Sequence, residues 1–124
     1  MARRKNSQSQ WILLILIMLV GFGLRFAYLD REMRFDESVT VYQFAAKSIP
    51  TIVGDYTWVN NHIFHSLLVH FPYTYLDKSP IFVRLPVLIL GMALIPMVFV
   101  AGSRFYNRNT GLIGASLVAV YPIL

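Results

Sequence analysis

Two adjacent carboxylates and two arginines are the residues whose types and spacing best suit catalysis. Asp36 and Glu37 stand in the segment RFDESV, directly after the first long apolar run. A carboxylate can accept a proton from an attacking hydroxyl, and a guanidinium can hold a phosphate through charge-assisted hydrogen bonds. Arg25, near the end of the first apolar run, and Arg84, at the start of the second, are the candidate phosphate ligands. The structural alternatives are that Asp36 caps a helix and that the arginines extend their charges to the water–lipid boundary.

Histidines and asparagines form a second group of polar residues. His62 and His65 are three residues apart, which places them on one helix face at a spacing compatible with metal binding. No third ligand is evident, and the favoured interpretation is that both rings keep their polar tips in water at an interface. Asn60 and Asn61 are candidate helix caps, and we take Asn61 with His62 as a candidate polar site.

The composition predicts a membrane protein. Of the 124 residues, 56% are hydrophobic and 14% are charged, which lies outside the usual range of soluble domains. The chain contains no cysteine, which excludes a disulfide framework, a thiolate metal site and a thiol nucleophile. The formal charge of +5 does not indicate a nucleic-acid partner, because the basic residues are scattered singly or flank apolar runs.

Apolar runs predict three membrane spans. Residues 11–29 would extend about 28 Å as a helix, close to the hydrocarbon thickness of about 30 Å. An uncleaved span is favoured over a signal peptide, since no small-residue cleavage site follows the apolar core. Residues 81–103 form the second predicted span, and residues 110–124 form a third that is still apolar at the last residue. We therefore expect the chain to be the N-terminal part of a longer multi-pass protein.

The charge distribution predicts the orientation. All six acidic residues lie between positions 30 and 77, whereas the basic residues of segments 1–10 and 104–109 are accompanied by no acid. The positive-inside rule then makes both segments cytoplasmic and places the loop 30–80 on the outer side. Apolar residues recur at helical spacing in this loop, so we expect short helices along the membrane interface. The predicted fold class is an all-α membrane protein with a long exoplasmic loop that carries interfacial helices.

The order of these pieces resembles the start of the polytopic glycosyltransferases of the protein-mannosyltransferase and aminoarabinose-transferase type. The first span ends in LRFAYL, and the segments FDESV, NNHIFHSLL and FVRLPVLILGMALIP follow in that order. The resemblance covers residues 24–124. It implies a GT-C-like fold, of which this chain would be the N-terminal part, in a multi-pass protein of the bacterial inner membrane.

The resemblance also implies an activity. Members of this family transfer a sugar from a polyprenyl-phosphate donor in the membrane lipid to an acceptor on the outer face, which can be a glycan, a lipid or a protein. Asp36 matches the family's catalytic carboxylate and Glu37 its acidic neighbour. Arg25 and Arg84 match arginines of the first and second spans.

His62 matches a family histidine that normally follows an aspartate and precedes prolines. In this chain the stretch reads NNHIF, without the aspartate and without the prolines. A divalent metal is the one cofactor that the resemblance leaves open. Two alternatives to an enzyme are kept: a non-catalytic multi-pass membrane protein, and an inert truncated fragment.

Overall fold

The computed structural model describes residues 2–29, 31–57 and 62–121. Helices account for 81% of the residues, and no β-strand occurs in these ranges, so the predicted all-α class is confirmed. The chain divides into two compact units. Unit 1 comprises residues 1–28 and 88–124, and unit 2 comprises residues 29–87.

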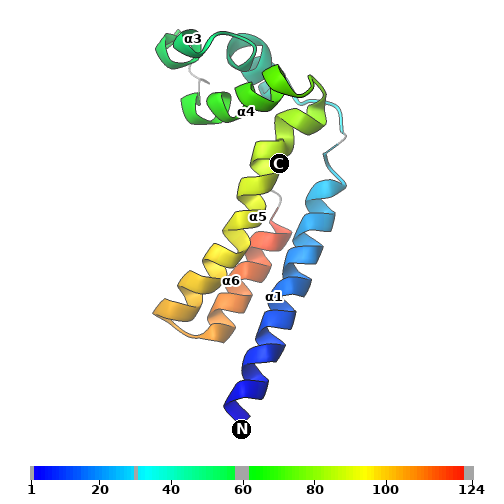
Figure 1. Ribbon diagram of the computed structural model, residues 1–124, viewed down its shortest axis with the longest axis vertical. Helices are drawn as coiled ribbons and strands as arrows, with labels where there is room; N and C mark the ends of the chain where they lie inside the picture. The colour runs from blue at the N-terminus through cyan, green and yellow to red at the C-terminus, as the bar shows by residue number, and fades with distance from the viewer. Residues whose placement is uncertain (1, 30, 58–61, 122–124) are drawn as a thin grey trace. The chain divides into compact units, whose positions relative to one another are not determined.

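Unit 1 is built from three helices that run side by side (Figure 1). They are α1 (Ala2–Phe26), most of α5 (Pro80–Phe105) and α6 (Arg108–Val120). The segment Gln8–Phe26 and the whole of α5 are long and apolar enough to cross a membrane. Helix α1 begins before the predicted start at residue 11, because no proline or glycine interrupts the polar residues that precede the apolar run. It ends at Phe26, three residues before the predicted end at 29.

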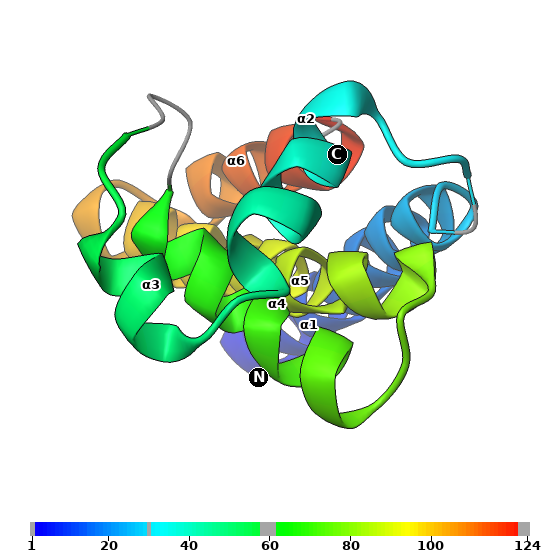
Figure 2. The same ribbon diagram turned by 90° about the horizontal axis from the view of Figure 1, so that it is seen from above.

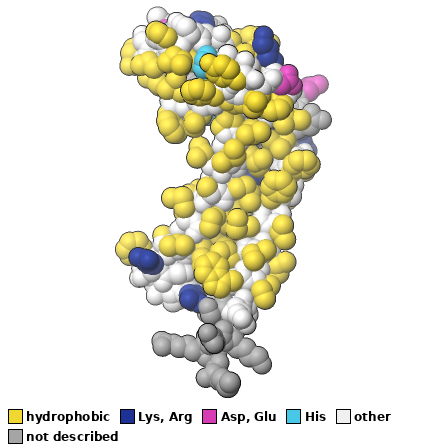
Figure 3. Space-filling model, viewed as in Figure 1, with side chains coloured by type: hydrophobic (Ala, Val, Ile, Leu, Met, Phe, Trp, Pro, Cys, Tyr) yellow, Lys and Arg dark blue, Asp and Glu magenta, His cyan; other side chains and the backbone are white. Residues whose placement is uncertain are grey.

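The long helices of unit 1 expose much of their apolar surface. Trp11 is 51% exposed, Leu19 61% and Met97 64%. Figure 3 shows hydrophobic side chains spread over the helices with few charged side chains among them. A water-soluble domain would bury most such residues of a central helix. This apolar surface is therefore suited to contact with lipid or with further protein.

Small residues let α6 pack closely in unit 1. Gly111, Ala115 and Ala119 recur at every fourth position of α6 and are buried. A Cβ atom on Gly102 of α5 would lie only 2.8 Å from the Cα atom of Gly111, so the two backbones touch there. Such spacing of small residues is typical of helix pairs that pack in membranes. At the start of α6, the Asn107 side chain accepts a hydrogen bond of 2.9 Å from the backbone N–H of Thr110 and caps the helix.

Unit 2 consists, in its described residues, of four short helices together with the first turns of α5 (Figure 2). They are α2 (Phe35–Val39), the π-helix η1 (Thr40–Ala45), α3 (Ile49–Gly54) and α4 (Ile63–Tyr75). The loop 30–80 thus contains short helices, as its sequence predicts. The core brings η1, α4 and α5 together through four buried residues, Val41, Ala45, Val69 and Val83.

A buried histidine joins two helices of unit 2. His70 of α4 is only 8% exposed, and its Nδ1 lies 2.8 Å from the carbonyl oxygen of Ala45 at the end of η1. A carbonyl can only accept, so Nδ1 carries the proton in this contact. This hydrogen bond joins the last turn of η1 to the middle of α4.

Candidate functional site

Helix α2 begins one residue before the predicted carboxylate pair. Its N-cap is Arg34, whose backbone is extended, and the backbone N–H of Arg34 donates a 2.9 Å hydrogen bond to Oε2 of Glu37. This contact is the acidic half of a capping box, since the glutamate stands three residues after the cap. The interpretation of Asp36 as the N-cap is therefore wrong. Asp36 lies inside the first turn, where a negative charge is still favoured.

Glu37 pairs with Arg84 of α5 at two points. Nε of Arg84 lies 2.9 Å from Oε1 of Glu37, and Nη2 lies 2.7 Å from Oε2. The Arg84 side chain is 7% exposed and that of Glu37 26% exposed, so the pair is largely shielded from water. A two-point pair of this kind fixes both the position and the plane of the carboxylate.

Arg84 also binds the backbone of the segment that leads into α2. Its Nη1 donates to the carbonyl oxygens of Leu29 and Arg31 at 3.0 and 2.8 Å, and its Nη2 donates to that of Glu32 at 3.0 Å. With the two bonds to Glu37, these contacts equal in number the five N–H donors of a guanidinium. Arg84 thus organises an irregular stretch of backbone by binding three of its carbonyl groups.

The two neighbouring carboxylates differ sharply in their surroundings. The hydrogen bonds and charge of Arg84 hold the pKa of Glu37 below its usual range, so Glu37 stays ionised and engaged. Asp36 is exposed, and its carboxylate has no hydrogen-bond partner within the described ranges. The structure therefore leaves Asp36 as the carboxylate of the pair that can meet a further group.

Arg25 lies in unit 1 and is 5% exposed. Its Nη1 donates to the carbonyl oxygens of Ala119 at 2.9 Å and Gly21 at 3.1 Å, and its Nη2 donates to that of Val118 at 2.9 Å. Val118 and Ala119 belong to the last turn of α6, so a cation sits where the helix dipole is negative. Arg25 therefore caps the C-terminal end of α6.

Glycines make room for this arginine. A Cβ atom on Gly91 of α5 would lie 3.1 Å from Nε of Arg25, and one on Gly21 would lie 3.2 Å from its Nη1. The three hydrogen bonds to carbonyls use three of the five N–H donors. Nε and the second hydrogen of Nη2 have no hydrogen-bond partner in the part of the chain that the structure describes.

His62 and His65, the two histidines considered from the sequence, lie in different environments. His62 is exposed and is the N-cap residue of α4. Burial and the nearby charge of His62 hold the pKa of His65 below its usual range, which favours the neutral ring. Asn60 and Asn61, the predicted caps, lie outside the described residues.

A metal ion has no evident ligand set here. Within the described ranges no group of three or more histidine, aspartate or glutamate side chains is placed to share an ion. Glu37 is already held by Arg84, which leaves Asp36 as the open carboxylate of the pair. The divalent metal considered from the sequence stays a prediction.

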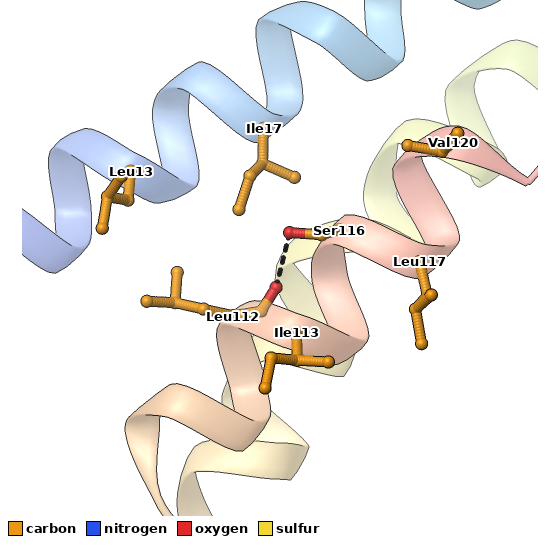
Figure 4. A pocket seen from close by; sticks show the side chains of 7 residues that line it. All are labelled: Leu13, Ile17, Leu112, Ile113, Ser116, Leu117 and Val120. Atoms are coloured by element: carbon orange, nitrogen blue, oxygen red, sulfur yellow. Dashed lines mark hydrogen bonds between the residues drawn. The ribbon is translucent and has the colours of Figure 1, made fainter.

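An open apolar groove runs between α1 and α6 of unit 1 (Figure 4). Its volume is about 540 Å³. The one polar side chain in its lining, Ser116, donates its hydroxyl to the carbonyl oxygen of Leu112 at 2.8 Å, so it makes no demand on a ligand. An apolar groove of this kind suits a hydrocarbon chain. It is lined by Leu13, Ile17, Leu112, Ile113, Ser116, Leu117 and Val120.

Of the candidate site residues, the structure brings together Glu37 and Arg84. The sequence did not indicate that Arg84 would bind backbone carbonyls or that Arg25 would cap α6. A signal for the second contact was present, because Gly21 stands one helical turn before Arg25 and leaves space beside it. Comparison of the chain with protein-family models, curated proteins and solved structures gives no significant match.

Proposed function

We propose that this chain is the N-terminal part of a membrane glycosyltransferase that moves a sugar from a polyprenyl-phosphate donor to an acceptor on the outer face. The observation that carries the proposal is the difference between the two neighbouring carboxylates. Glu37 is fixed by Arg84, and the neighbouring Asp36 presents an unengaged carboxylate. A base needs this combination of a rigid support and free access.

The proposed reaction needs little more than a placed base and a stabilised leaving group. The acceptor hydroxyl attacks the anomeric carbon of the sugar, and its proton passes to Asp36. The bond between the anomeric carbon and the phosphate oxygen breaks, and the lipid phosphate leaves with the electron pair. Orientation of the hydroxyl and removal of its proton are each known to lower such barriers.

The two arginines contribute differently to this proposal. Arg84 has its donors engaged by Glu37 and three carbonyl groups, so its support of the proposal is to position the base. Arg25 retains two N–H donors beside its bonds to α6, and these are the donors that a lipid phosphate would use. Because the side chain is only 5% exposed, the phosphate would have to reach a covered group. Phosphate binding by either arginine remains a prediction.

The membrane arrangement is part of the proposal. Helices α1 and α5 would be the first two spans and α6 the start of a third, with residues 1–10 and 104–109 cytoplasmic and the loop 30–80 outside. The exposed apolar surface of unit 1 supports this arrangement, and the groove between α1 and α6 would accept the hydrocarbon tail of a lipid donor. The bacterial inner membrane is the location that the proposed donor implies.

The test is sugar transfer by the complete protein in membranes supplied with labelled polyprenyl-phosphate sugars. Asp36→Asn keeps the size of the side chain and removes the base, so transfer should fall about 100-fold or more while insertion is unchanged. Glu32→Gln is the matched control, because Glu32 is also an exposed acid of unit 2 and contacts Arg84 through its backbone carbonyl. Wild-type turnover in Asp36→Asn would rule out Asp36 as the base. Absence of transfer by the complete wild-type protein would support a non-catalytic membrane protein instead.

A further inference from the structure

Helix α4 buries two polar residues and exposes three aromatic residues on its opposite side. Ser66 and His70 are buried in unit 2, at 0% and 8% exposure, together with Val69. On the opposite side, Phe64 is 71% exposed, Phe71 54% and Tyr75 72%. A helix on the surface of a water-soluble domain has the reverse arrangement.

The exposed aromatic residues form one continuous stripe. Phe64, the half-buried Leu68, Phe71 and Tyr75 follow the spacing i, i+4, i+7 and i+11, which keeps them within about 40° of one direction around the helix. The rings of Phe71 and Tyr75 stack with centroids 6.2 Å apart. We call these four residues the aromatic stripe of α4.

The chain connection places this stripe near the end of a candidate span. Four residues separate Tyr75 from Pro80, where α5 begins, so the two points lie within about 20 Å of each other. With 26 residues, α5 is about 39 Å long, which exceeds the hydrocarbon core of about 30 Å. If α5 crosses the membrane, its first turns lie at the level of the headgroups, and α4 ends close by.

The residues at this end of α4 suit the headgroup region. Lys78 follows the helix, and its Nζ lies 5.8 Å from the centre of the Tyr73 ring. Asp77 is the neighbouring acid, and both charged residues are exposed. Aromatic side chains with a lysine beside them are typical of segments that rest in the boundary between water and lipid.

We propose that the aromatic stripe of α4 rests in the headgroup region of a phospholipid bilayer, with the helix lying along the surface. The proposal specifies which face of the loop meets lipid. It depends on the membrane location proposed above and not on the transfer reaction. A second protein segment over the same stripe is the competing occupant that the test must separate.

The absence of cysteine allows a direct test. Single cysteines placed at 64, 71 and 75 are spin-labelled, and the chain is reconstituted in vesicles of phosphatidylethanolamine and phosphatidylglycerol. Thr74→Cys is the control on the same helix, because Thr74 is exposed beside the stripe. Met97→Cys is the control on α5, because Met97 is an exposed residue of that candidate span. Accessibility to oxygen, which concentrates in lipid, is compared with accessibility to a water-soluble nickel complex.

The proposal predicts that the three stripe labels are several-fold richer in oxygen collisions, relative to nickel collisions, than the label at 74. High nickel accessibility on the stripe would overturn it, because the stripe would then face water. Low accessibility to both reagents would also overturn it, since protein would cover the stripe. Nickel accessibility at position 97 as well would show that the membrane location itself is wrong. All five sites are exposed positions, so the substitutions leave the core intact.

Discussion

Arg84 and Glu37 lie 47 positions apart in the sequence and form an ion pair with contacts of 2.9 and 2.7 Å. The same guanidinium donates to three backbone carbonyls of the segment before α2. Charged groups removed from water are costly unless every donor is engaged, and here the bonds equal the donors in number. The pair therefore holds the start of α2, and with it Asp36, against the first turns of α5.

Replacing Arg84 should loosen this part of unit 2. Arg84→Lys keeps the charge but removes the two-point geometry and most of the carbonyl contacts. Loss of a buried partner costs about 3–5 kcal/mol, and the partial exposure of Glu37 lowers our expectation to about 2–4 kcal/mol. Hydrogen exchange of the amides in residues 35–45 would report the change as faster opening. Arg34→Lys is the control, because Arg34 reaches Glu37 through its backbone N–H; equal exchange in both variants would contradict the prediction.

Acid should weaken unit 2 through the same pair. The pKa of Glu37 is lowered in the folded state, mainly by its hydrogen bonds to Arg84. A lowered carboxylate pKa contributes stability that is present above the unfolded value, about 4.3 for glutamate, and is lost as the pH falls through the lower folded value. We expect the urea resistance of unit 2 in detergent micelles, followed by circular dichroism, to decline below about pH 4.3.

The variant Glu37→Gln separates this effect from general acid denaturation. It removes the titrating group, so the stability should start lower at neutral pH and depend less on pH in the acid range. Asp55, whose pKa is lowered by hydrogen bonds from Thr57, remains in the variant and accounts for residual pH dependence. Parallel curves for the wild type and the variant would rule out Glu37 as the main acid-sensitive group.

Hydropathy predicted the long helices well but could not predict what their arginines bind. Apolar runs near residues 11–29 and 81–103 became α1 and α5 because a long run without charges has few alternatives to a helix. The partners of Arg84 are carbonyl groups, and every residue carries one. No residue type therefore marks Leu29 or Arg31 as a ligand, and only the folded backbone shows it.

The start of α2 illustrates a second limit of the sequence. Asp36 is of a residue type favoured as a helix N-cap, yet the helix begins at Phe35 with Arg34 as the N-cap. Glu37 accepts a hydrogen bond from the Arg34 N–H and pairs with Arg84, and these two contacts outweigh the preference for aspartate at the N-cap. A contact distant in sequence thus decided a boundary that local rules would place two residues later.

Removing Arg25 should unravel the end of α6. Arg25→Leu takes away the hydrogen bonds to Val118 and Ala119 and the cation at the negative end of the helix dipole. Loss of charge-assisted bonds at a helix end costs about 1–3 kcal/mol, which hydrogen exchange of the last turn of α6 would detect. Arg104→Leu, at the exposed end of α5, is the matched control. Unchanged protection in Arg25→Leu would show that the cap does not stabilise α6.

Glycine substitutions should separate close helix packing from helix propensity. A Cβ atom on Gly111 would lie 2.6 Å from the carbonyl oxygen of Phe99, whereas one on Gly23 would meet nothing within 4 Å. Alanine favours a helix over glycine by about 1 kcal/mol, so Gly23→Ala should leave unit 1 as stable or slightly more stable.

Gly111→Ala gains the same propensity but must push α5 and α6 apart, because the atom it meets is backbone and cannot rotate away. We expect a net loss of about 1–3 kcal/mol, the range for overpacked sites. The measurement is the denaturant midpoint of the helical signal in micelles for both variants. The contrast in sign is the prediction, since both changes add one methyl group to a helix. A gain in both variants would mean that α5 and α6 do not touch at Gly111.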